Sequence, residues 1–158
     1  MALETLVVAV GPNDNTRTDE LTEAVLDVAI PTDSSVVLLH AFDERAYEKG
    51  IEEAGFDPDE SPSANELAER LEGIDIISEA LDAADVPCEI RGEIGAEGDT
   101  ILQTTEAVGG DLLYISGRKR SPTGKAVFGS ISHRIMMNSS CPVLFVREGV
   151  YSDDENVE

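Results

Sequence analysis

Five short strand-like segments, each followed by a longer polar or helical segment, constrain the fold of this chain more than any other feature. The clearest is Leu6–Val10, which is closed by the turn residues Gly11–Pro12–Asn13–Asp14. An apolar run without polar alternation is typical of a strand that is buried on both faces of a sheet. We expect the other four strands at residues 36–42, 88–94, 112–116 and 143–146.

Helical patterns lie between these segments. After the first strand, Leu21, Val25 and Val28 recur at helical spacing, and Thr18 is the expected N-cap. Ser63–Glu66 has the pattern of a capping box, which predicts a long second helix ending near residue 84. We expect further helices at 100–108, capped by Asp99, and at 130–137, and a surface excursion over residues 43–62 that is irregular or partly helical.

Strands that alternate with helices predict a single α/β domain with a doubly wound, five-stranded parallel sheet and helices on both faces. We place this domain at residues 1–148 and expect the acidic tail, residues 149–158, to lack fixed structure. In such sheets, ligands bind at the carboxyl ends of the strands, where the strand order reverses. The loops expected to form that crevice are 11–14, 41–43 and 117–128.

The charge of the chain excludes several kinds of partner. The formal net charge is −22, from 33 acidic and 11 basic residues, so nucleic acids and anionic membranes will repel it. Many acids with few lysines suggest adaptation to high salt, where screening makes self-repulsion tolerable. No apolar run is long enough to span a membrane, and the N-terminus lacks a basic signal-peptide region, so we expect a cytoplasmic protein.

Catalytic and metal-binding patterns are absent from the sequence. Cys88 and Cys141 lack metal-ligand spacing, and we interpret them as two buried free thiols. His40 and His133 are isolated, so we expect structural roles for both. Without a nucleophile–base pattern or paired carboxylates, we name no catalytic residue and no metal ligand.

The segment from Leu112 to Arg147 is unusual because its 36 residues include six basic residues and no acid. The other 122 residues hold all 33 acids and only five bases. Buried strands account for part of this segment, but they do not explain why the exposed loop and the following helix also lack acids. The absence of acids there therefore needs a separate explanation.

A phosphate site would explain it, because a Gly-containing loop that opens onto a helix N-terminus favours anions. Gly129–Ser130 lies where the helix should begin, and Arg118, Lys119, Arg120 and Lys125 add positive charge. Alternatively, the loop is solvated and its bases pair with the acidic surface. The spacing of glycines fits neither a Walker A loop nor a dinucleotide-binding fingerprint.

The sequence resembles the universal stress protein (UspA) family over residues 3–148, as an acidic, haloarchaeal-like member. The family motif is Gly-x2-Gly-x9-Gly-Ser/Thr after the fourth strand, followed by a helix and a Pro-Val-x-x-Val strand. Gly129–Ser130 matches the end of the motif, and Cys141–Val146 matches the final strand. Ser116 and Lys119 replace the first two motif glycines, Gly117 lies one place from the first, and Gly11 stands where nucleotide-binding members carry Asp.

The resemblance implies strand order 3-2-1-4-5, a Rossmann-like fold of the adenine-nucleotide alpha-hydrolase type, and a stress-response or signalling role. The ligand it implies is ATP or AMP, with Mg²⁺ only when a nucleotide is bound and at most slow ATP hydrolysis. By matching motif positions, the expected binding residues are Gly11, Asn13 (or Asp14), Ala41, Ser116, Gly117, Arg118, Lys119, Arg120, Gly129 and Ser130.

The family also contains members that bind no nucleotide, and they act through homodimerisation and partner binding. The resemblance implies that two copies pair through the fifth strand, across a two-fold axis. The interface residues would be Val143, Leu144, Phe145 and Val146. Both functions stay open on the sequence alone.

Overall fold

A five-stranded parallel sheet organises the chain in our computed structural model, which describes residues 2–11, 18–57, 59–117 and 129–147. The strand order is β3-β2-β1-β4-β5, as predicted. Every pair of neighbouring strands is parallel. The strands are β1 (Thr5–Ala9), β2 (Ser35–Phe42), β3 (Cys88–Ile94), β4 (Leu112–Gly117) and β5 (Val143–Arg147).

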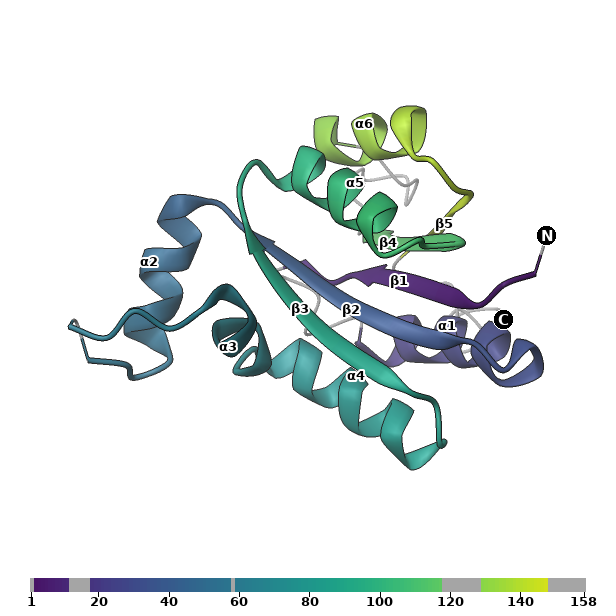
Figure 1. Cartoon of the computed structure of the whole chain (residues 1–158), viewed down its shortest axis with the longest axis horizontal. Helices are drawn as coiled ribbons and strands as arrows, with labels where there is room; N and C mark the ends of the chain where they lie inside the picture. Colours follow the sequence, from purple (N-terminus) through teal and green to yellow (C-terminus); the bar gives the residue numbers. More distant parts are fainter. Residues whose placement is uncertain (1, 12–17, 58, 118–128, 148–158) are drawn as a thin grey trace, which may run out of the picture.

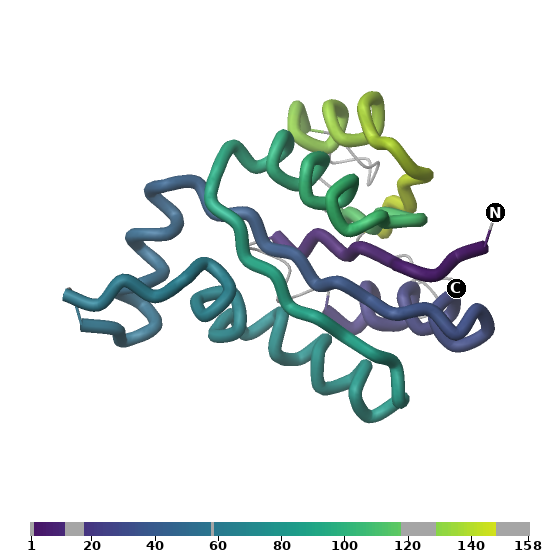
Figure 2. Tube along the Cα trace, viewed as in Figure 1, coloured from purple at the N-terminus to yellow at the C-terminus, as the bar shows by residue number. Residues whose placement is uncertain are grey.

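Helices cover both faces of this sheet (Figure 1). One face carries α5 and α6, whereas α1 and α4 cover the other. The chain between β2 and β3 forms α2, α3 and α4, and its first part reaches beyond one end of the sheet (Figure 2). The helices are α1 (Thr18–Thr32), α2 (Glu44–Glu53), α3 (Ala64–Glu69), α4 (Glu72–Ala83), α5 (Glu97–Ala107) and α6 (Ser130–Asn138).

The central strand β1 contributes to two hydrophobic cores, one on each face of the sheet. Successive side chains of a strand point to opposite faces. Leu6 and Val8 therefore pack with the core under α1 and α4, whereas Val7 packs with the core under α5 and α6. All three side chains are completely buried, as the continuous apolar run predicted.

Of the expectations for residues 43–84, the surface excursion is partly helical, and the single long helix was wrong. Residues 44–53 form the helix α2, and the Asp43 side chain caps it by accepting from the Ala46 N–H at 2.7 Å. The capping box at Ser63–Glu66 is confirmed, but the helix that it starts ends at Glu69. Leu71 is extended, and α4 begins after it. The break lets α3 pack against β3 while α4 packs against α1, which a single straight helix could not do.

Two predicted caps also differ. Asp99 lies inside the first turn of α5, whose N-cap is Ala96, and its carboxylate pairs instead with Arg134 of α6 at 2.6 Å. Thr18 is the first helical residue of α1, where it is buried. Asp99 and Thr18 both lie in the first turn of their helices. The sequence pattern therefore predicted where each helix begins to within one turn, but it did not identify the N-cap residue.

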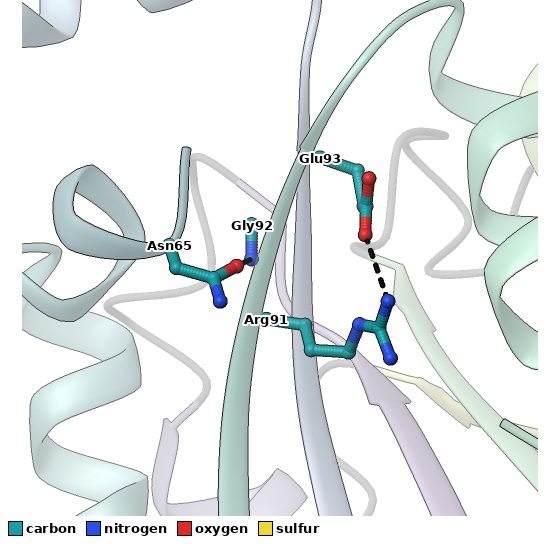
Figure 3. Close-up of polar contacts among 4 residues, drawn as sticks. All are labelled: Asn65, Arg91, Gly92 and Glu93. Atoms are coloured by element: carbon teal, nitrogen blue, oxygen red, sulfur yellow. Dashed lines mark hydrogen bonds and ion pairs between the residues drawn. The ribbon is translucent and has the colours of Figure 1, made fainter. Parts of the chain in front are cut away.

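The outer edge of β3 is closed by the chain itself (Figure 3). The Gly92 N–H points away from β2 and donates to the side-chain oxygen of Asn65, in α3, at 2.7 Å. A Cβ added at Gly92 would lie 2.0 Å from the backbone oxygen of Ala64, so only glycine lets α3 approach this closely. On the other side of the strand, Arg91 pairs with Glu93 at 3.2 Å. An edge covered in this way is a poor site for pairing with another chain.

Within the described residues, the structure contains no helix that combines the length and apolar character needed to cross a membrane.

Replacing Asn65 tests how the β3 edge is held. In Asn65→Ala the Gly92 N–H loses its acceptor, and we expect the free energy of unfolding to fall by about 1–2 kcal/mol. The matched control is Asn65→Asp, which keeps an oxygen acceptor at the same place and should stay within about 0.5 kcal/mol of the parent. Denaturant unfolding measures both variants, and equal losses would contradict the assigned hydrogen bond.

Candidate functional site

The predicted crevice lies at the carboxyl end of β1, because β1 stops before its two neighbours. Its last pairs are Ala9–Leu39 with β2 and Val8–Tyr114 with β4. β2 continues to Phe42 alongside β3, and β4 continues to Gly117 alongside β5. Each neighbour thus runs three residues beyond its last pair with β1, or roughly 10 Å. We call this region the β1 notch and define it by Val10, Gly11, Ala41, Ser116 and Gly117.

Ser116 brings an unused polar group to the notch. Its Oγ is buried and has no hydrogen-bond partner among the residues that the structure describes. Ser116 lies two residues beyond Tyr114 and therefore faces the α1 side of the sheet, where the Tyr114 hydroxyl donates to the Ala24 carbonyl at 3.1 Å. Because a buried hydroxyl without a partner costs free energy, Ser116 is a candidate for hydrogen bonding to a ligand.

Gly117 has a packing role that the sequence did not suggest. A Cβ at this position would lie 2.6 Å from the tip of the Phe145 ring, which is partly buried in the core under α5 and α6. The glycine therefore makes room for an aromatic ring of the neighbouring strand. Gly117 also lies at the end of β4 and is therefore part of the notch. Its packing against Phe145 and its place in the predicted binding site need to be separated by experiment.

The N-terminus of α6 has a strong positive partial charge. Gly129 is its N-cap, in extended conformation, and makes no side-chain capping hydrogen bond. In the described ranges, α6 is the only helix without an acid in its first turn. The first N–H groups of a helix have no acceptor within the helix, so Ser130 and the residues after it can bind an anion.

The structure therefore divides the predicted binding residues into three groups. It brings Gly11, Ala41, Ser116 and Gly117 together at the ends of neighbouring strands, as expected. It places Gly129 and Ser130 at the start of α6, which follows β4 in the chain. The predictions for Asn13, Asp14, Arg118, Lys119, Arg120 and Lys125 lie outside the described residues.

A cavity of about 290 Å³ beside Gly11 was not predicted. It exists because α3 and α4 are separate helices, and the sequence pattern indicated one. The Arg70 guanidinium at this rim lies over the Phe56 ring, 4.6 Å from its centroid. Two acids on the rim make the cavity unfavourable for phosphate. The lining residues are Val10, Gly11, Gly50, Glu53, Ala54, Leu67, Arg70, Leu71, Glu72, Gly73 and Ile74.

The two cysteines differ in their exposure to solvent, and so do the two histidines. Both thiols are free, but Cys88 is exposed and Cys141 only partly buried, so the prediction of two buried thiols was wrong. Desolvation of the Cys88 thiol, together with the nearby carboxylates of Glu89 and Asp82, raises its pKa to about 11. At neutral pH the Cys88 thiol is therefore protonated. His40 is buried, as expected for a structural role, whereas His133 is exposed.

Comparison with known proteins gives a family match over nearly the whole chain. The model of the Universal stress protein family matches residues 3–147. A curated universal stress protein from Mycolicibacterium smegmatis is 34% identical over 68 residues. That match covers 42% of this chain and 52% of the relative, so the chain matches about half the length of that protein.

Solved structures share the fold at low sequence identity. A universal stress protein from Archaeoglobus fulgidus, in complex with dAMP, superposes with a TM-score of 0.62 at 14% identity, covering 92% of this chain and 99% of that one. A universal stress protein family protein from Arabidopsis thaliana, with AMP bound, has a TM-score of 0.61 at 15% identity and covers 94% of both chains. The similarity shows that the folds agree.

The packing role of Gly117 can be separated from ligand binding with a double-mutant cycle. Gly117→Ala forces a methyl group against the Phe145 ring, and we expect a loss of about 1–3 kcal/mol in the free energy of unfolding. Phe145→Leu removes the ring, so adding Gly117→Ala in that background should cost much less. Thermal or denaturant unfolding of the four proteins measures the coupling. Equal costs in both backgrounds would show that Phe145 is not the constraint.

Proposed function

The chain belongs to the universal stress protein family, and from that membership we propose that it binds an adenine nucleotide across the β1 notch. In this proposal, the nucleoside lies over Gly11 between Ala41 and Ser116, and the phosphate lies toward the N-terminus of α6. The bound AMP and dAMP of the Arabidopsis thaliana and Archaeoglobus fulgidus structures support an adenine nucleotide as the ligand class.

The absence of acids at the start of α6 carries the proposal. In a chain of net charge −22, an acid in the first turn is common, and the other described helices have one. An acid there would stabilise α6 by its interaction with the helix dipole. Without that acid, the positive potential at the start of α6 is available to an external anion. The notch, with the buried hydroxyl of Ser116, lies at the same end of the sheet, where the parallel strands have their carboxyl ends.

Electrostatics also orients the nucleotide. The cavity beside Gly11 has Glu53 and Glu72 on its rim and, among the described lining residues, only one cation, Arg70, so the net negative charge disfavours a phosphate group there. An uncharged base or ribose has no such penalty, and the cavity volume is near the lower limit for small-ligand pockets. The nucleoside therefore faces the α2–α4 side of Gly11, and the phosphate faces α6.

The departures from the family motif fit a modified site. Ser116 replaces a motif glycine and adds a hydroxyl at the notch, where its Oγ can hydrogen-bond a ligand oxygen or nitrogen. Lys119 replaces the second glycine and adds a cation, which suits phosphate. Mg²⁺ would enter only with a di- or triphosphate, because it binds most readily through phosphate oxygens.

Calorimetric titration of the full chain with AMP, ADP and ATP at molar salt tests the proposal. We expect saturable heat and a rise in melting temperature with at least one nucleotide. Replacing Lys119 and Arg120 together by Ala should weaken binding roughly tenfold or more, because two cations are removed near the phosphate.

The matched control changes two other cations, Arg45 and Arg91, to Ala. It alters the net charge by the same amount at positions in α2 and β3, away from the α6 N-terminus. We expect it to bind nucleotide as the parent does. If all three nucleotides give neither heat nor a thermal shift, the nucleotide-binding proposal fails.

A second candidate function, homodimerisation through β5 and partner binding, is favoured by the contrast between the two edges of the sheet. α3 closes the β3 edge at Gly92, whereas β5 is the opposite edge strand and pairs only with β4 in the described residues. Because the Pro142 carbonyl accepts from Leu113 of β4, the Val143 N–H points away from β4. An apolar edge strand of this kind is suited to pairing with a second copy.

The structure also shows how that interface should be tested. Val143 and Phe145 pack in the core under α6, so charged residues there would damage the fold as well as any interface. Val143→Pro instead removes one outward N–H, and Val143→Ala keeps it. We expect the Pro variant to be monomeric and the Ala variant dimeric by analytical ultracentrifugation. A dimer of unchanged stability in the Pro variant would contradict pairing through β5.

The acidic composition supports adaptation to high salt as part of the same proposal. At net charge −22, self-repulsion destabilises the compact state in dilute buffer. The Debye length falls from about 10 Å at 0.1 M to about 3 Å at 1 M salt, which removes most of that repulsion. Nucleotide affinities of this chain are for this reason best measured at molar salt.

A further inference from the structure

His40, a buried side chain in β2, holds the end of β1. It is 5% exposed, and its Nδ1 lies 2.6 Å from the Val10 carbonyl oxygen. Because a carbonyl can only accept, Nδ1 carries the proton in this contact. The ring also packs edge-on against Phe42, with 4.4 Å between the ring centroids. Both contacts fix the imidazole at the floor of the β1 notch.

This hydrogen bond takes the place of a backbone hydrogen bond between the strands. The Val10 N–H donates to the Leu39 carbonyl at 2.9 Å, so the next step of a parallel ladder would join the Ala41 N–H to the Val10 carbonyl. The backbone groups of Phe42 point toward β3, because its carbonyl accepts from the Gly95 N–H. Successive residues of a strand point their backbone groups in opposite directions, so the Ala41 N–H points toward β1. In the part of the chain that the structure describes, no backbone acceptor pairs with the Ala41 N–H.

We propose that His40 is a positioning residue for the nucleotide site. By drawing the Val10 carbonyl oxygen toward Nδ1, it ends the β1–β2 ladder one step early and keeps the Ala41 N–H directed into the notch. A free N–H at that place suits a ring nitrogen of a purine base. The inference rests on the proposed function for its ligand, but the effect of His40 on the ladder is a property of the ligand-free protein.

The ladder can be measured by NMR as scalar coupling through the hydrogen bond, together with hydrogen exchange of the Ala41 amide. In the parent protein we expect no coupling from the Ala41 N–H to the Val10 carbonyl. His40→Phe keeps an aromatic ring and removes the donor, so the coupling should appear and exchange at Ala41 should slow about tenfold. His40→Asn keeps an N–H donor near Nδ1 and should behave as the parent does.

A merely structural role would give a different result. Loss of packing alone would speed exchange along β1 and β2 in both variants, without a gain of protection at Ala41. Coupling between Ala41 and Val10 in the parent protein would overturn the inference at once, whether or not a variant folds. So would an intact His40→Phe protein that shows no such coupling.

Titration with AMP, without added metal, tests the link to binding. We expect affinity to fall about tenfold in His40→Phe and to be retained in His40→Asn. Equal AMP affinity in the parent and His40→Phe would overturn the positioning role while leaving the proposed function intact. If the parent binds no AMP, the positioning role fails for lack of this ligand, and the NMR result stands as a separate finding about the ladder.

Discussion

The burial and early end of β1 are the constraints on which the rest of this structure depends. Its side chains point alternately into two cores, so α1 and α4 on one face and α5 and α6 on the other are all held by the same strand. Because the strand is central, its last residues also form the floor of a recess between β2 and β4. Core packing and the recess at the end of β1 therefore have one physical origin.

The distribution of charged side chains distinguishes two regions around this recess, the start of α6 and the cavity on the α2–α4 side. Acids occupy the first turns of the described helices except α6, where the dipole stays uncompensated. On the α2–α4 side, Glu53 and Glu72 make the cavity hostile to phosphate. In a chain with a net charge of −22, the start of α6 is thus a place where the first helical turn carries no acid.

The two edges of the sheet show how local contacts decide exposure. At β3, one glycine and one asparagine let α3 cover the strand, with the Gly92 N–H satisfied by a side chain. At β5, Phe145 reaches inward over Gly117, and the outward N–H of Val143 has no comparable cover from the described residues. The two edge strands of one sheet therefore differ in how far the described residues cover them.

The sequence by itself determined the fold class and the order of the elements, because apolar periodicity and turn residues are local signals. The tertiary structure decided where the helices divide and which contacts individual side chains make, because local signals carry no information about residues distant in the chain. The helix predicted over 64–84 is divided because its halves pack on β3 and α1. Gly117 suggested phosphate binding but accommodates a ring from β5, and His40 suggested ordinary packing but holds the Val10 carbonyl. Each of these depends on residues distant in the chain, and only folding brings them into contact.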